Sequence, residues 1–367
     1  MKIAQFHTAF EAIAPASIAW KGDNIGLLIG RPERAITNVL VALDLTEAVI
    51  ADAVRKRANL IITHHPAVFH PLKNITPSSS AGTLALEAIE RNIAVYAAHT
   101  NLDSVRWGVN FSLASVLGLQ NVRILSPIDG SLTNITVFVP AAHTDAVADA
   151  MHSAGAGMFE KYDTCSFRSD GTGTFRGNSG ASPFIGTVGN VERVQEVRLE
   201  MLCAQWKVKS VLSAMLKAHP YEEVAYTVTP ISNRNTEYGL GAIGELPAAM
   251  GQQAFLTMVK ERLQTPAVRY SGHSRTIRRV AVCGGSGSEF IRDAAAQGAD
   301  AMVTADCKYH TFQEHEQSLL LVDAGHYETE VVVLPALADV VRSILKTGRH
   351  TGKVFITKTR TNPVHIF

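Results

Sequence analysis

Short apolar runs alternate with amphipathic segments through the first third of the chain. Residues 39–45 and 59–63 have nearly continuous apolar side chains, which is typical of buried strands. The segment 46–57 between them repeats its apolar residues at helical spacing. A helix over 80–92 and a strand over 93–98 are expected next. Strands that alternate with helices of this length predict βαβ units and a mainly parallel sheet.

The last third of the chain repeats this alternation. Residues 39–65 align with 280–306 without a gap, so that Val39 corresponds to Val280 and Thr63 to Thr304. A duplicated unit and two independent βαβ segments would both produce this similarity. We predict strands over 278–284, 299–306 and 318–324, with helices over 288–298, around 312–317 and over 329–348.

The middle of the chain has a different texture, with two strand–helix–strand passes separated by a glycine-rich stretch, residues 171–183, that we expect to form loops. Two such passes indicate a small ferredoxin-like α+β domain. We therefore predict an α/β protein in which two similar βαβ half-segments, residues 1–125 and 244–367, form a three-layer α/β/α core. The ferredoxin-like α+β domain is inserted between them at 126–243.

The composition is that of an ordinary globular chain, with 46% hydrophobic residues and a net charge of +1 over 367 residues. A charge so near zero argues against a protein that binds nucleic acid through its phosphates. No stretch of about 18 apolar residues occurs, and the N-terminus lacks the apolar core of a secretory signal. The four cysteines are scattered, as expected for reduced thiols. We expect a cytoplasmic protein without a membrane segment.

Two adjacent histidines, His64 and His65, follow the apolar run that ends at Thr63. Ligands of α/β sheets bind beyond the carboxyl ends of the strands, where this pair lies. Neighbouring side chains on a strand point to opposite faces. Pro66 biases His65 toward an extended loop, where that alternation no longer applies. Both imidazoles are thus free to converge on one site.

Two further strand ends carry a histidine with a carboxylate four residues later. His99 precedes Asp103 after one strand, and His326 precedes Glu330 after another. An i, i+4 pair at a helix start places both side chains on one face. Each pair alone is more often a hydrogen-bonded loop residue with a carboxylate that favours the helix dipole. Three strand ends that offer such residues together favour a metal site.

Imidazole and carboxylate are the ligand types of zinc, iron and manganese. A single tetrahedral ion needs about four ligands, whereas five or six suit two ions that share a water. The candidates are His64, His65, Asp103, His326 and Glu330, with His99 as an alternative sixth.

The motifs around these residues resemble the dinuclear-metal-centre proteins known as GTP cyclohydrolase 1 type 2 homologues, or NIF-three-like proteins. The resemblance is carried by LIITHHPAVFH (60–70), AAHTNLD (97–103) and VDAGHYETE (322–330). In the middle, HPYEEVAYTV (219–228) and YGLGAIGEL (238–246) resemble the extra domain of the longer bacterial members. The match covers nearly the whole chain.

This resemblance implies two divalent ions per chain, zinc, iron or manganese, on His64, His65, Asp103, His326 and Glu330. It also implies a toroidal homohexamer with the metal sites facing its cavity, and it places His99 beside the ligands rather than among them. One departure concerns the family's Trp-Asp-Asn sequence. Here Lys21 and Gly22 separate Trp20 from Asp23 and Asn24, which leaves the roles of Trp20 and Asp23 open.

Weaker signals lie near the fourth strand end. Asp306, Lys308 and His310 would support the ligands or transfer protons, or form a structural salt bridge. The GGSGS stretch (284–288) would cradle a phosphate at a helix N-terminus, or simply form a tight βα turn, which we favour. GTGTFR (171–176) is expected to be a hairpin or loop.

Two functions fit these residues. The first is a metal-dependent hydrolase, by resemblance of the GTP cyclohydrolase I type, which opens the purine imidazole ring and releases formate. In it His99 or His310 would move protons for a small-molecule substrate. The second is a metal-binding assembly or regulatory protein, whose ring and inserted domain bind a protein or metabolite partner. Open metal positions suit the first and closed ones the second.

Overall fold

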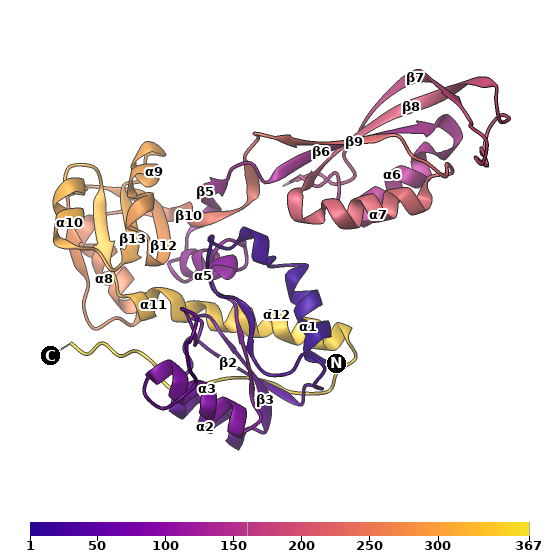
Figure 1. Ribbon diagram of the computed structural model, residues 1–367. Coiled ribbons are helices and arrows are strands. Elements are labelled where there is room, and N and C mark those ends of the chain that lie inside the picture. The colour runs from indigo at the N-terminus through magenta and orange to yellow at the C-terminus, as the bar shows by residue number, and fades with distance from the viewer. Residues whose placement is uncertain (160, 367) are drawn as a thin grey trace. The chain divides into compact units, whose positions relative to one another are not determined.

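The computed structural model describes residues 1–159 and 161–366. The chain forms a mixed α/β structure that divides into two compact units (Figure 1). The larger unit comprises residues 1–126 and 238–367, and the smaller one comprises residues 127–237. Within the described residues, no helix is long and apolar enough to cross a membrane.

One sheet of the larger unit is built mostly from the first third of the chain. Its strands are β1 (Gly26–Ile29), β2 (Asn38–Ala42), β3 (Ala58–Thr63), β4 (Ala94–Ala97) and β15 (Val354–Ile356). They lie in the order β1-β4-β3-β2-β15. The neighbours β2, β3 and β4 are parallel, and β1 pairs antiparallel with β4. The other edge strand, β15, comes from the C-terminal part of the chain and pairs parallel with β2.

The second sheet of the larger unit has a related arrangement. Its strands are β5 (Gln120–Ile128), β10 (Asn235–Met250), β11 (Arg269–Ser271), β12 (Ile277–Ser286), β13 (Ala301–Ala305) and β14 (Leu320–Asp323). They lie in the order β11-β14-β13-β12-β10-β5. Here β12, β13 and β14 are parallel, and β11 pairs antiparallel with β14. Against β12, β10 is antiparallel, whereas β15 is parallel to β2 in the first sheet.

Residues that correspond between 39–65 and 280–306 also occupy equivalent positions in the two sheets. Val41 pairs with Ile62, and the corresponding residues Val282 and Val303 also pair. The parallel ladders therefore run in the same register, and their carboxyl ends supply loops at equivalent places. The positions beyond the strands can then be compared one by one.

Helices cover the sheets through apolar faces. Their bounds are α1 (Ile3–Glu11), α2 (Glu47–Arg55), α3 (Ser80–Glu90), α4 (Thr100–Asp103), α5 (Val109–Val116), α8 (Gln252–Leu263), α9 (Ile291–Ala296), α10 (Tyr309–His315), α11 (His326–Glu330) and α12 (Leu334–Thr347). On β12, Val280 and Val282 pack with α5 and α8, whereas Ala281 packs with α9. This alternation follows from the two-residue period of a strand. On the first sheet, Leu40 packs with α2 and α3, and Tyr96 stacks edge-on with Phe6 of α1.

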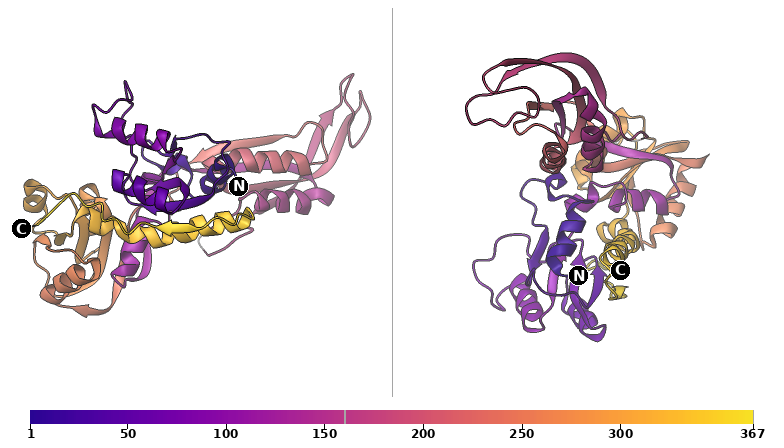
Figure 2. Two further views of the ribbon diagram at one scale, coloured as in Figure 1. Left: turned by 90° about the horizontal axis from the view of Figure 1, so that it is seen from below. Right: turned by 90° about the vertical axis from the view of Figure 1, so that its right-hand side faces the viewer.

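One helical run links the two sheets of the larger unit. The short helix α11 follows β14 and continues through a 3-10 helix, η5 (Val331–Val333), into α12. The yellow ribbon in the left view of Figure 2 shows this run. Helix α11 contacts β12 and β13, and α12 contacts β2 and β15. Side chains of the last third are thus brought to the strand ends of the first third.

The smaller unit contains one antiparallel sheet with two helices. Its elements are β6 (Leu132–Pro140), α6 (Thr144–Ser153), β7 (Phe167–Arg176), β8 (Val191–Ala204), α7 (Val208–Ala218) and β9 (Tyr226–Ile231). The strands lie in the order β7-β8-β6-β9. Apolar side chains of β6 and β8, such as Val137 and Leu199, pack against α6 and α7.

The glycine-rich stretch of this unit is a loop only in its second part, residues 177–183. Residues 171–176 form the second half of β7 and pair with β8 along its length. A Cβ at Gly173 would lie 2.0 Å from Glu196 Oε2, so a side chain there would meet that carboxylate. The missing side chain reflects a close approach to the neighbouring strand, and turn residues alone do not distinguish these two uses of glycine.

Candidate metal centre

His64 and His65 lie just beyond β3, and their backbone amides still bond to the end of the neighbouring strand. His64 N donates to Ala42 O at 3.3 Å, and His65 N donates to Leu43 O at 3.0 Å. The backbone bends at both residues. As a result the two rings lie near one another, with centroids 5.0 Å apart.

His65, His326 and Glu330 form one group of ligand atoms. Glu330 Oε2 lies 2.9 Å from His65 Nε2 and 3.1 Å from His326 Nε2, and the two imidazole Nε2 atoms lie 3.3 Å apart. Glu330 is almost fully buried, at 4% exposure. His65 comes from the first third of the chain, and His326 and Glu330 come from the last. Their ligand atoms lie within 4.8 Å of one another, close enough for a single metal ion to bind them all.

His64 and Asp103 test whether a cation fits here. His64 is fully buried, and its Nδ1 lies 2.9 Å from Ala98 O, so Nδ1 carries the proton and Nε2 presents a lone pair. That lone pair faces Asp103 Oδ1 and Glu330 Oε1, each at 3.7 Å. Neither His64 Nε2 nor Asp103 Oδ1 has a hydrogen-bond partner within the described part of the chain. Buried acceptors without a donor are costly, and a divalent cation between them would satisfy them.

His99 joins His64 and His65 in a second group of ligand atoms. His99 directly precedes α4, and its side chain makes no capping bond to the helix. Its Nδ1 instead bonds to Asp23 Oδ1 at 2.9 Å. Asp23 also accepts from Thr100 N at 3.1 Å. The departure in the Trp-Asp-Asn sequence therefore leaves Asp23 in direct contact with the site.

Carboxylates hold the outer nitrogen of each remaining histidine. Asp44 Oδ1 lies 2.6 Å from His65 Nδ1, and Asp306 Oδ2 lies 2.7 Å from His326 Nδ1. A carboxylate in this place fixes the proton on Nδ1 and turns the Nε2 lone pair inward. Asp306 therefore lies against His326, and its part in supporting a ligand or in proton transfer stays a prediction.

The charges of the cluster follow from these contacts. Burial opposes a charge on His65, but hydrogen bonds to Asp44 and Glu330 outweigh it and raise its pKa to about 10. In the same way, Glu330 and Asp306 overcome burial and raise the pKa of His326 to about 9. Burial raises the pKa of Asp103 to about 6. Protons therefore stabilise the cluster when no metal is bound, and metal binding must displace them.

Gly285 makes room for the buried carboxylate. It lies in β12 at the register shift between the pairs Val282–Val303 and Ser286–Ala305, and has a φ of +61°. A Cβ at this position would lie 2.2 Å from Glu330 Oε1. Its amide donates to Thr329 Oγ1, and that of Gly287 donates to Thr304 Oγ1. These amides are already bonded, which favours the tight turn over a phosphate cradle.

Lys308 and His310 are both exposed. Lys308 precedes α10, and His310 Nδ1 lies 3.3 Å from Gln313 Oε1. Neither belongs to a group of convergent ligand atoms among the described residues. The structure gives them no direct part in the cluster.

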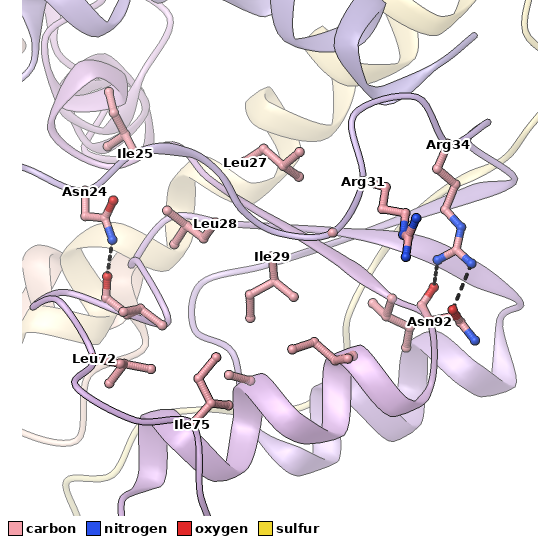
Figure 3. Close-up of a pocket in the computed structure, with 15 residues that line it drawn as sticks. Asn24, Ile25, Leu27, Leu28, Ile29, Arg31, Arg34, Leu72, Ile75 and Asn92 are labelled. Atoms are coloured by element: carbon pink, nitrogen blue, oxygen red, sulfur yellow. Dashed lines mark hydrogen bonds between the residues drawn. The ribbon is translucent and has the colours of Figure 1, made fainter.

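A cavity of about 620 Å³ lies between β1, α3 and the loop after His65. Apolar side chains such as Leu28 and Ile75 line it, as Figure 3 shows. Arg34, at one end, bonds to Asn92. No candidate ligand is among the lining residues, so this cavity lies outside the metal centre.

Two contacts of the cluster were missed in the sequence. Asp44 follows β2, and the rule that singled out the other strand ends would have found it. Glu328 lies between His326 and Glu330 on α11 and is buried, at 6% exposure. No spacing rule singles it out, because its partners lie about 30 residues later in the chain.

Comparison with known proteins identifies the class. The Duf34/NIF3 (NGG1p interacting factor 3) family matches residues 1–363, and the chain belongs to this family. A Bacillus cereus protein described as related to NIF3 has a solved structure with a TM-score of 0.90, 37% identity, and coverage of 100% of this chain and 99% of its own. A Staphylococcus aureus protein gives a TM-score of 0.79 at 30% identity, with the same coverage.

Relatives in two bacteria share the name GTP cyclohydrolase 1 type 2 homolog. The Halalkalibacterium halodurans protein is 40% identical over 371 residues, covering 99% of both chains. The Bacillus subtilis protein is 40% identical over 359 residues, covering 96% of this chain and 95% of its own.

Proposed function

We propose that this protein is a metal-dependent hydrolase with two divalent ions, zinc, iron or manganese, held by His64, His65, Asp103, His326 and Glu330. The observation that carries the proposal is the convergence of three imidazole Nε2 lone pairs on two carboxylates, with buried acceptor atoms that have no donor. When bound, such ions supply Lewis-acid chemistry and activate water near neutral pH.

The residues of the chain have distinct tasks in this proposal. The carboxylates Asp44 and Asp306 hold His65 and His326 with their lone pairs inward. His99 moves a proton, because Asp23 fixes its Nδ1 and its ring lies against that of His64, with centroids 5.2 Å apart. The burial of Glu330 and His64 keeps bulk water from competing with the ligands.

The finer proposal is hydrolytic opening of the purine imidazole ring of GTP. Its support is the name shared by relatives at 40% identity over nearly the full chain. In this reaction a first water adds to the imidazole carbon and one ring C–N bond breaks, which leaves a formamide. A second water hydrolyses the formamide, so that the remaining C–N bond breaks, the nitrogen takes up a proton and formate leaves.

We also propose a cytoplasmic homohexamer, in keeping with the family resemblance. In the larger unit, helices on both faces of each sheet support a three-layer α/β/α core. In the smaller unit, the order of elements and the strand order β7-β8-β6-β9 support a ferredoxin-like insertion. A monomeric mass in light scattering would refute the hexamer.

The test is product analysis with a panel of nucleotides and phosphate esters, on protein reloaded with manganese, iron or zinc. We expect turnover in the wild-type protein, loss of metal and turnover in His65→Ala, and retained metal with reduced kcat in His99→Gln. Metal binding without turnover for any substrate would reject the hydrolase and favour the assembly or regulatory protein. Unchanged metal content in His65→Ala would reject the ligand assignment.

A further inference from the structure

The segment after β15 bonds to two carboxylates beside the candidate ligands, Asp44 and Glu328. Thr357 N continues the pairing of β15 by donating to Val41 O at 3.0 Å, and Thr357 Oγ1 donates to Asp52 Oδ2 at 3.0 Å. The chain then leaves the sheet and contacts residues that touch the candidate ligands. We call residues 357–362 the C-terminal strap.

The strap holds the carboxylate behind His65. Thr361 Oγ1 donates to Asp44 Oδ2, while Asp44 Oδ1 accepts from His65 Nδ1. Both oxygens of Asp44 are therefore engaged, one by the ligand and one by the strap. A carboxylate fixed at both oxygens cannot rotate without losing one of these bonds, so Thr361 limits the orientation of the His65 ring.

The strap also holds the helix that carries His326 and Glu330. Glu328 lies between them on α11, and its Oε1 accepts from Arg360 Nη2 at 3.1 Å and from Asn362 Nδ2 at 2.9 Å. The Arg360 guanidinium also lies over the Tyr327 ring, 5.7 Å from its centroid. Helix α11 spans five residues at the start of the run that continues into α12, and the bonds at Glu328 add a hold at this end of the run.

We propose that the C-terminal strap positions the metal ligands, with Thr361 acting on His65 through Asp44, and with Arg360 and Asn362 acting on α11 through Glu328. These are positioning residues, because none of them belongs to the convergent ligand groups found in the described residues. The inference rests on the proposed metal centre but not on the proposed hydrolysis.

The physical argument is one of shared support. His65 belongs to the first third of the chain, and His326 and Glu330 belong to the last, yet their ligand atoms must meet within a few tenths of an ångström of fixed positions. The strap bonds to Asp44, which holds His65, and to Glu328, which lies on the helix of His326 and Glu330. It therefore limits how far His65 can move from His326 and Glu330. Its loss would leave every ligand in the chain but loosen their mutual geometry.

The test uses a pair of identical substitutions in the strap. Thr361→Val removes the bond to Asp44, which holds His65. Thr357→Val removes an equivalent hydroxyl–carboxylate bond to Asp52, whose ion pairs are with Arg55 and Lys56. We expect Thr361→Val to weaken Mn²⁺ and Zn²⁺ binding by about 10-fold or more, as loss of a ligand's hydrogen-bond support does. Thr357→Val should stay within about 2-fold of the wild-type affinity on the same basis, and Thr361→Ser should restore it.

Titration calorimetry with each metal gives the affinities. Equal affinities for Thr361→Val, Thr357→Val and the wild type would overturn the strap proposal and leave the metal centre standing. Absence of metal binding by the wild type would overturn both. This test measures metal affinity and not turnover. A failure of the hydrolase proposal would therefore show in the product analysis and would leave this result unchanged.

A second measurement examines α11 in the metal-free protein. Asn362→Ala removes a donor to Glu328 without touching Asp44, and hydrogen–deuterium exchange then reports on the amides of residues 326–333. We expect faster exchange in that segment and unchanged exchange in β15. Unchanged exchange in residues 326–333 and in β15 would overturn the proposal that Arg360 and Asn362 position α11 through Glu328.

Discussion

The ends of the two parallel ladders in the larger unit share a register but supply opposite things to the site. Position 44 beyond β2 and position 285 on β12 correspond in the alignment. The first is Asp44, whose carboxylate holds His65. The second is Gly285, whose missing side chain leaves room for Glu330. One sheet edge carries a carboxylate that supports a ligand, and the other carries a glycine that leaves space for one. The shared strand register therefore does not determine which residue type an equivalent position carries.

The two His-x-x-x-carboxylate pairs differ for a related reason. Thr63 pairs with Ala97 and Thr304 with Asp323, so His99 is the second residue after its ladder and His326 is the third. A shift of one residue rotates a helical side chain by about 100°. His326 begins α11 and faces Glu330, whereas His99 precedes α4 and turns to Asp23. The spacing gives a close ion pair between His326 and Glu330, at 3.1 Å.

The largest expected effect is the loss of the carboxylate that three histidines share. Glu330→Gln should lower metal affinity by more than the about 10–100-fold that loss of a supporting group costs, since Glu330 faces His64, His65 and His326. Asp103→Asn should cost less, because Asp103 lies 3.7 Å from His64 Nε2, whereas Glu330 lies 2.9 Å from His65 Nε2 and 3.1 Å from His326 Nε2. Elemental analysis and titration calorimetry measure both. Two tightly bound ions in Glu330→Gln would contradict the central role assigned to Glu330.

A smaller effect is expected on the stability of the metal-free protein. The pKa of His65 is raised from 6.5 to about 10, so its contribution is fully present below pH 6.5 and is lost as the pH rises toward 10. We expect the free energy of unfolding to fall by about 1–3 kcal/mol between pH 6.5 and 9, when screening of this partly exposed group is allowed for.

Urea unfolding at several pH values measures this slope. His65→Gln should reduce this slope without abolishing it, because the pKa of His326 is also raised, to about 9. Asp103→Asn should leave it intact above pH 7, because the pKa of Asp103 is raised only to about 6. The same slope in the wild type and in His65→Gln would contradict the assignment.

The smallest effect is expected at the end of the cluster that Asp23 supports. Asp23→Asn weakens the hold on His99, so kcat should fall as in His99→Gln while both ions stay bound, because His99 is not one of the five proposed ligands. Titration calorimetry should give metal affinities within about 2-fold of the wild type. A larger loss of affinity would place His99 among the ligands.

Much of the framework could be predicted from local pattern. The apolar runs at 39–45 and 59–63 became β2 and β3, and the helical spacing at 46–57 became α2. The edge strands β1, β11 and β15 were not predicted, because they are short and their pairing partners lie far away in the chain. Residues 171–176 pair antiparallel with β8, as the hairpin alternative allowed and the loop alternative did not. The sequence left both open because glycine in a strand and glycine in a turn look alike.

The sequence by itself determined the residue types of the site and the strand ends at which they lie, because local periodicity fixes where strands stop. Only the tertiary structure decided which side chains face each other. It turned His99 to Asp23, placed Asp44 behind His65, and laid the C-terminal strap against α11. These contacts join residues tens to hundreds of positions apart, and their formation depends on packing and register, which no local spacing encodes.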